Sequence, residues 1–395
     1  MATAVALIYI KPNYIKQKAA PFANKASFNV QDCYVDKIVV EVPASYELIQ
    51  IAYSLTETFQ TDKILLNKNT SYYKDVDSYF SKFKDHELIR KIDKFLSRDT
   101  SGYAHIPNRL ISLFYDINDN NRLIYNDMAT FSYPILRKLY QSDYFILMEN
   151  TDLIDDFAEK TNFIAFYNDH KNYYAQLICL IKQLCDFENM KNWLERKFAI
   201  KYSSYRIVFS PLTGGSHNAV YQEDVKKGVK QALIFVCPPD ETLQITDNNF
   251  ELKVGQMARV VFTEIDHNYV NPLSDRYEKQ LNSAMPIYKA WSSEKEIHYS
   301  SNYSVFNEYM TWGVFNLYAL DTYSPENAES IIQTVEQQML NRHFQRFPAF
   351  NKKLMEMYKE KSKPTIDQLY EPMLEWIKAE TSSHSTPYKM MFENR

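Results

Sequence analysis

Residues 261–272 read Val-Phe-Thr-Glu-Ile-Asp-His-Asn-Tyr-Val-Asn-Pro and combine apolar residues at helical spacing with hydroxyl, carboxylate and imidazole groups. This pattern predicts a helix over residues 254–270. We expect Asn271-Pro272 to end the helix, because a residue that precedes proline avoids the α conformation. Thr263, Glu264 and His267 stand at positions i, i+1 and i+4, so their side chains share one side of the helix.

This spacing is that of the motif His-Glu-x-x-His, from which the sequence differs at the first position alone. In that motif two histidines bind zinc, and the glutamate accepts a proton from the metal-bound water. The sequence therefore makes Glu264 a candidate general base and His267 a candidate zinc ligand. Thr263 holds the place of the first histidine. Because a catalytic zinc site normally uses three protein ligands, either another residue completes the site or zinc is no longer held tightly.

Glu308 is the next candidate ligand. It lies in an apolar stretch that predicts a helix over residues 303–319. A carboxylate buried in such a helix is costly unless it is paired or bound to metal. Glu308 is therefore either a second metal ligand or the partner of an arginine, for which Arg259 and Arg276 are the candidates.

Three further residues are candidates for a substitute ligand or for lining the site: His217, His298 and Asp266. His217 lies beside Gly214-Gly215, His298 lies between the two predicted ligand helices, and Asp266 precedes His267. Each residue also has an interpretation that involves no metal. His217 and His298 can be histidines of a turn or of the surface, and Asp266 can be a solvated acid on a helix.

The pattern along the rest of the chain predicts an α+β fold that is mostly helical. A strand at residues 39–43 precedes a large helical region, and a small antiparallel sheet or hairpin at residues 205–237 precedes the motif helix. An edge strand of this hairpin can accept an extended peptide. We expect a region over 1–200, a second over 201–360, and a last helix with a frayed tail over 361–395. The other predicted helices lie at about 46–55, 72–98, 134–140, 151–168, 171–186, 188–197, 275–291, 325–340, 348–360 and 365–380.

Composition excludes several functions for this chain of 395 residues. A net charge of −4 gives no electrostatic basis for binding nucleic acid. Six glycines cannot supply the phosphate-binding turns of nucleotide enzymes, and Gly214-Gly215-Ser216-His217 is not the elbow of a serine hydrolase. The four cysteines contain no Cys-x-x-Cys pair, and we expect buried free thiols at Cys179 and Cys185. No stretch is long enough to span a membrane, and the apolar residues 1–10 are a trimmed export signal, a first strand or an expression artefact.

Several stretches, in their order and separation, resemble a family of Bacteroidota proteins known only as a domain of unknown function, which is similar to the gluzincin-type, zincin-like metallopeptidases. They are Val40 to Val42 with Tyr46 to Leu48, Ser71 to Phe80 with Asp85-His86, Gly214-Gly215, Thr263 to Pro272, and Asn307 to Tyr309. The resemblance covers roughly residues 35–360. It implies a zincin-like fold, zinc as cofactor, Glu264 as general base, and His267 and Glu308 as ligands. It also implies an exported protein of the periplasm, envelope or extracellular space.

Three functional hypotheses follow from the sequence. The first is a zinc-dependent peptidase whose first ligand is altered at Thr263. The second is a catalytically inactive pseudopeptidase that binds a peptide or protein, in which Thr263 has broken the metal site. In the third hypothesis, residues 254–270 form an ordinary core helix and contain no functional site. The sequence does not predict the substrate or the oligomeric state.

Overall fold

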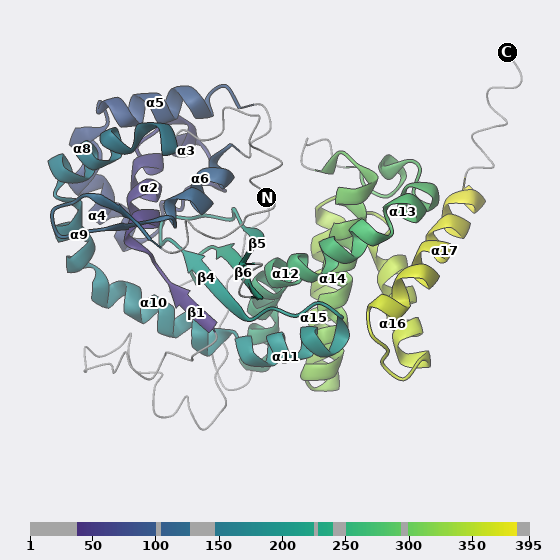
Figure 1. Cartoon of the computed structure of the whole chain (residues 1–395). Helices are drawn as coiled ribbons and strands as arrows, with labels where there is room; N and C mark the ends of the chain where they lie inside the picture. The colour runs from purple at the N-terminus through teal and green to yellow at the C-terminus, as the bar shows by residue number, and fades with distance from the viewer. Residues whose placement is uncertain are drawn as a thin grey trace, which may run out of the picture. The chain divides into compact units, whose positions relative to one another are not determined.

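The computed structural model describes residues 38–99, 104–126, 147–224, 228–239, 250–293 and 299–384, which form two compact units (Figure 1). The first unit contains the described residues of 38–185 and 202–239, and the second contains those of 186–201 and 250–384. The units divide the chain differently from the expected regions. The strands of residues 204–236 belong to the same unit as the N-terminal helices. The last described helix, over residues 367–384, belongs to the second unit.

The first unit is built on a four-stranded mixed sheet, with the strand order β1-β4-β6-β5. Its two central strands contain continuous buried apolar runs, as strands covered on both faces do. Helices and a two-stranded ribbon, β2-β3, complete the unit. The sheet strands are β1 (Ile38–Glu41), β4 (Ser204–Phe209), β5 (Asn218–Asp224) and β6 (Val229–Val236). The other elements are α2 (Ala44–Ser54), α3 (Glu57–Thr61), α4 (Ser71–Phe80), η2 (Ser81–Phe83), α5 (Glu87–Leu96), α6 (His105–Ser112), β2 (Tyr115–Ile117), β3 (Leu123–Tyr125), η4 (Met148–Asn150), α8 (Thr151–Thr161), α9 (Phe163–Asp169) and α10 (Lys171–Leu184).

The expected hairpin between residues 205–210 and 232–237 is wrong. These two runs are β4 and β6, and they pair in parallel, with Ile207 opposite Ile234. The antiparallel partner of β6 is β5, whose sequence Asn-Ala-Val-Tyr-Gln-Glu-Asp is too polar to be recognised as a strand. A strand at the edge of a sheet needs no continuous apolar run, because one side of it has no neighbouring strand.

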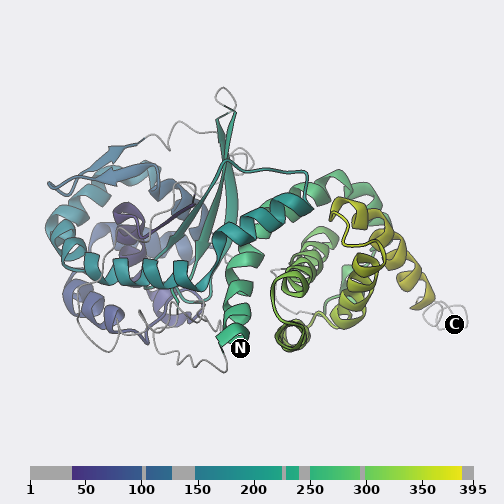
Figure 2. The same ribbon diagram turned by 90° about the horizontal axis from the view of Figure 1, so that it is seen from below.

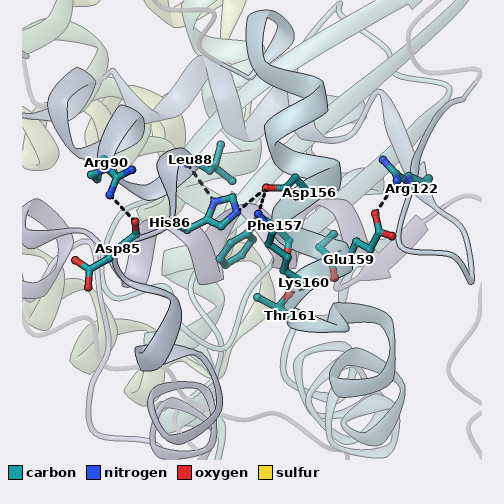
Figure 3. Close-up of polar contacts among 11 residues, drawn as sticks. Asp85, His86, Leu88, Arg90, Arg122, Asp156, Phe157, Glu159, Lys160 and Thr161 are labelled. Atoms are coloured by element: carbon teal, nitrogen blue, oxygen red, sulfur yellow. Dashed lines mark hydrogen bonds and ion pairs between the residues drawn. The ribbon is translucent and has the colours of Figure 1, made fainter.

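His86, which lies in a stretch that carries the family resemblance, joins two helices of the first unit (Figure 3). Its Nδ1 accepts the backbone N–H of Leu88 and so caps the start of α5. Its Nε2 therefore carries the proton and donates to Asp156 of α8 at 3.0 Å. Lys160, one turn further along α8, also contacts Asp156, at 2.7 Å. His86 thus has a structural role within this unit.

The second unit is helical. Its helices α13 to α17 run next to one another in colours from green to yellow (Figure 2). The helix α12 packs along α14, where the ring of Phe262 stacks on Tyr318 and meets Phe315 edge to face. Every residue of α14 from Val305 to Ala319 is buried, so this helix forms the centre of the core. The elements are α11 (Phe187–Lys197), α12 (Phe250–Arg276), α13 (Glu278–Ala284), η5 (Tyr288–Ala290), α14 (Asn302–Thr322), α15 (Pro325–Asn341), α16 (Phe347–Glu360) and α17 (Asp367–His384).

The helix α12 does not end at Asn271-Pro272, as expected, but continues through Pro272 to Arg276. Hydroxyl groups of neighbouring helices bind carbonyl groups next to the proline. Tyr370 donates to the carbonyl of Val270, and Tyr303 donates to the carbonyl of Asn271, each at 3.2 Å. These contacts stabilise a turn that the proline would otherwise disrupt.

Other expectations differ from the structure in detail. The predicted helix 275–291 is divided into α13 and the short η5. Cys185 is buried and outside any disulfide, as expected, but Cys179, although buried, is disulfide-bonded. The predicted helix 134–140 and residues 1–10 lie outside the described residues. Among the helices that are described, none has the length and apolar content needed to cross a membrane.

Candidate functional site

His267 and Glu308 come together in the second unit, from α12 and α14. Nε2 of His267 lies 3.5 Å from Oε1 of Glu308. Two donor atoms of a tetrahedral zinc site, each about 2.1 Å from the metal, are separated by about 3.4 Å. The distance between the two residues is therefore compatible with two ligands of one metal ion, and equally with a direct ion pair.

Arg342, which directly follows α15, is the second partner of Glu308. Its Nη2 lies 2.8 Å from Oε2 of Glu308 and donates to the hydroxyl of Tyr299 at 2.6 Å. The expectation that an arginine pairs with Glu308 is confirmed, but the arginine is Arg342 and neither of the two named examples. Arg259 stacks on the ring of Trp312, and Arg276 binds Asp367. Glu308 is 7% exposed. Burial raises its pKa, but the charge of Arg342 and the hydrogen bond and charge of His267 outweigh burial and lower the pKa to about 2.

His267 is held as a cation by this arrangement. Burial lowers its pKa, but the hydrogen bond and charge of Glu308, together with the charge of Glu264, raise it to about 9. Its Nδ1 lies 3.3 Å from Oδ1 of Asn271, which accepts the second ring proton, and 3.5 Å from the hydroxyl of Thr311. A doubly protonated imidazole has no lone pair for a metal ion.

Glu264 lies one turn before His267 on the same side of α12 and is half-buried. Burial and the negative charge of Glu308 raise the pKa of Glu264, whereas the charges of His267, Arg342 and Arg259 lower it, and the result is a pKa of about 7. A carboxylate with such a pKa exchanges protons near neutral pH, as a general base must. Its role as general base stays a prediction.

Thr263 and Asp266, the other two candidates on α12, are both buried. Thr263 is buried, and its hydroxyl donates to the backbone carbonyl of Val260. Asp266 is not the solvated acid of the ordinary interpretation, because it is fully buried and its carboxyl oxygens have no hydrogen-bond partner in the described structure. Burial raises the pKa of Asp266 well above its usual value, and the charges of Glu264 and Glu308 raise it further. Its charge in turn raises the pKa of Tyr370, so Asp266 lies towards α17.

The two histidines proposed as substitutes have different positions. His217 belongs to the first unit, where its Nδ1 accepts the backbone N–H of Cys237 at 3.2 Å. His298 lies outside the described residues, although Tyr299, which follows it, contacts Arg342. The substitute-ligand role of each stays a prediction. In the described ranges, no group of three or more histidine, cysteine, aspartate or glutamate residues has the arrangement of a metal site.

A family model described as a domain of unknown function, DUF4932, matches residues 35–315. The chain belongs to the DUF4932 family. The match includes Thr263, Glu264, His267 and Glu308 but ends before Arg342. Comparison with curated proteins found no match, and comparison with solved structures found none either.

Sequence reasoning missed Arg342, Tyr299 and Thr311, which complete the surroundings of His267 and Glu308 in the DUF4932 chain. An arginine after an ordinary helix carries no local signal of such a role. Only the packing of α15 against α14 and α12 brings Arg342 to the carboxylate.

Proposed function

We propose that this DUF4932 protein is a metallopeptidase-like protein that binds a peptide or protein and does not hydrolyse it. In this proposal an ion-paired cluster, consisting of His267, Glu308 and Arg342, stands where a zinc peptidase has its metal. This is the pseudopeptidase hypothesis from the sequence analysis, with the addition that these three residues take the place of the metal ion.

The observation that carries the proposal is that both carboxylate oxygens of Glu308 are already paired with cations, Oε1 with His267 and Oε2 with Arg342. A zinc ion at this point would have to displace the proton of His267 and lie near the positive charge of Arg342. With Thr263 bonded to the backbone, His267 and Glu308 are the two ligands that the described residues would offer it. The described donor set therefore falls short of a catalytic zinc site.

The edge strand β5 supports the peptide-binding part of the proposal. It pairs with β6 on one side only, and no other described strand lies beyond it in the sheet. An extended peptide can add to such an edge through main-chain hydrogen bonds, with alternate side chains facing opposite sides of the sheet. This mode of binding does not depend on a metal ion.

Zinc-dependent hydrolysis is the second candidate, and two observations favour it. The distance of 3.5 Å between His267 and Glu308 suits two zinc ligands, and the pKa of about 7 suits Glu264 as a general base. In a hydrolase, zinc would supply an activated water, Glu264 would accept its proton, and a third ligand would come from a residue such as His298.

Metal analysis and peptide binding together test the proposal. Protein purified without chelator should contain far less than one zinc per chain, and added zinc should not raise its unfolding temperature. Extended peptides should bind, and N-methylation of alternate peptide nitrogens should remove binding, because it removes strand hydrogen bonds. Near-stoichiometric zinc that is lost in His267→Ala, together with peptide cleavage that is lost in Glu264→Gln, would establish the hydrolase instead.

A further inference from the structure

Arg109, on α6 in the first unit, is a fully buried arginine without a counter-charge. Its Nη1 donates to the carbonyl oxygen and to Oγ of Ser216, each at 3.1 Å. Its Nε and Nη2 are buried and have no hydrogen-bond partner, and no carboxylate pairs with it among the described residues. Arginine stays charged in proteins, and a buried charge without a partner is among the most costly arrangements in a folded chain.

The two unpaired nitrogens form one edge of the guanidinium group. The N–H bonds of Nε and Nη2 point in parallel, and this is the edge that binds both oxygens of a carboxylate or two oxygens of a phosphate. Ser216 accepts its two hydrogen bonds from Nη1, the nitrogen outside this edge. The bonds to Ser216 therefore orient the guanidinium group and leave its bidentate edge open.

Two tyrosine hydroxyl groups of α2, the helix that packs against α6, also lack a well-formed hydrogen bond. Tyr46 and Tyr53 are fully buried, and their hydroxyls make only poorly aligned contacts, that of Tyr46 with Thr213 and that of Tyr53 with Asn108. Burial raises the pKa of each tyrosine, and the charge of Arg109 lowers it, so both hydroxyls lie within electrostatic reach of the guanidinium group. Two N–H donors of Arg109 therefore lack an acceptor, and the two tyrosine O–H groups of the adjacent helix lack a well-aligned one.

His105, one turn before Arg109, adds no second positive charge. Its Nε2 lies 3.1 Å from Oγ of Ser216, and burial and the charge of Arg109 lower its pKa well below the usual range. The imidazole is therefore neutral. The site carries a single positive charge, which suits a small anion.

The loop Gly214-Gly215-Ser216 fixes the base of this site. A Cβ atom at Gly214 would lie 2.5 Å from the backbone oxygens of Lys63 and Ile64, so only glycine allows the loop to approach so closely. The backbone N–H of Ser216 donates to the carbonyl of Ile64 at 3.1 Å. Gly214, Gly215 and Ser216 are partly exposed, so the loop that binds the guanidinium group of Arg109 reaches the surface.

We propose that the first unit contains a binding site for an oxyanion, a carboxylate or phosphate group, held by the Nε–Nη2 edge of Arg109 and the hydroxyls of Tyr46 and Tyr53. The anion supplies the missing counter-charge and accepts the unpaired donors. The site uses residues of the first unit alone and is independent of the His267–Glu308 pair.

Titration of the full chain with inorganic phosphate and with acetate tests this site, with chloride at matched ionic strength as the reference. Calorimetry should give saturable binding with one site per chain. The ligand should raise the temperature of an unfolding transition that circular dichroism detects and that tryptophan fluorescence, which reports on the second unit, does not. Phosphate alone binding would identify a phosphate site, and acetate binding as well would identify a carboxylate site. An anion effect no larger than that of chloride would overturn the proposal.

Variants of Arg109 and of the two tyrosines distinguish a loss of anion binding from a loss of folding. Arg109→Lys keeps the charge but loses the bidentate edge and should weaken binding at least about tenfold, whereas Tyr46→Phe and Tyr53→Phe should each weaken it about fivefold. Arg122→Gln is the matched control, because Arg122 is a half-exposed arginine of the same unit that pairs with Asp155 and Glu159, and it should bind like the wild type. If Arg109→Lys does not fold, the tyrosine variants decide, and unchanged affinity in both would refute the site.

Discussion

Glu308 joins His267 and Arg342, and its contact with His267, at 3.5 Å between Oε1 and Nε2, connects α12 with α14. The carboxylate is surrounded by two cations, and its low pKa and the high pKa of His267 have the same origin, their mutual attraction in a buried place. At neutral pH the three side chains of the cluster are therefore charged, and the charge of Glu308 is paired within the cluster. Three predictions concern this cluster and its surroundings in the second unit, and a fourth concerns the loop at Gly214 in the first unit.

Thr263→His should create zinc binding. A histidine at position 263 would stand four residues before His267 on the same side of α12, and with Glu308 it would give the three ligands that a zinc site needs. We expect near-stoichiometric zinc in the variant and little in the wild type, measured by elemental analysis after dialysis. The zinc should disappear again in Thr263→His combined with His267→Ala. A variant that folds but stays free of zinc would show that Thr263 is not what prevents metal binding.

Arg342→Met should destabilise the second unit. It removes one of the two cations from a buried carboxylate, and because Arg342 keeps some contact with solvent we expect a loss of about 2–3 kcal/mol. All four tryptophans, Trp193, Trp291, Trp312 and Trp376, belong to this unit, so urea unfolding followed by tryptophan fluorescence reports on it alone.

Arg276→Met is the matched control for Arg342→Met. Arg276 lies in the same unit, but its side chain is 54% exposed and pairs with Asp367 at the surface. Its loss should cost less than about 1 kcal/mol. Equal effects of the two substitutions would contradict the importance of the buried pair.

The pH dependence of stability should be set by the same cluster. His267 binds its proton more tightly in the folded chain, so its contribution is complete below about pH 6.5 and is lost as the pH rises to about 9. Glu264, with a pKa raised to about 7, acts in the same direction between about pH 4.5 and 7. Glu308 acts in the opposite direction, and its contribution, present above about pH 4.5, is lost as the pH falls towards 2.

The unfolding temperature of the second unit should therefore fall as the pH rises from 5 to 9, and fall again in strong acid. His267→Gln should flatten the decline between pH 6.5 and 9 in the fluorescence melting curve, because glutamine does not titrate. A wild-type unfolding temperature that rises over this range would show that His267 is neutral in the folded chain.

The sequence predicted both helices that carry the site because their apolar periodicity is strong, although it ended α12 six residues too early. For α14 the prediction of 303–319 compares with Asn302–Thr322, and Ser301 caps its start in a capping box with Ser304. The meeting of His267 with Glu308 was also expected, because the family resemblance makes both residues ligands of one metal ion.

Other features depend on contacts that no local pattern contains. The helix α12 passes through Pro272 because Tyr303 and Tyr370, distant in the chain, bind the neighbouring carbonyls. The polar strand β5 is a strand because β6 offers it an edge. The pairing of Arg342 with Glu308 requires the chain to reverse after α15, and this depends on tertiary packing.

Gly214→Ala should loosen the loop that holds Ser216. The new Cβ would lie 2.5 Å from two backbone oxygens, which cannot rotate away as a side chain would, so we expect a loss of about 1–3 kcal/mol in the first unit. Hydrogen exchange should show faster exchange of the amides of Asn67 and Ser216, which bond across this contact to Leu212 and Ile64. Gly228→Asn is the control, because Gly228 has a φ of +64° with nothing within 4 Å of an added Cβ, and asparagine tolerates this conformation. Unchanged amide protection in Gly214→Ala would mean that the loop can move aside without breaking its bonds, and the close approach at Gly214 would then not be what positions Ser216.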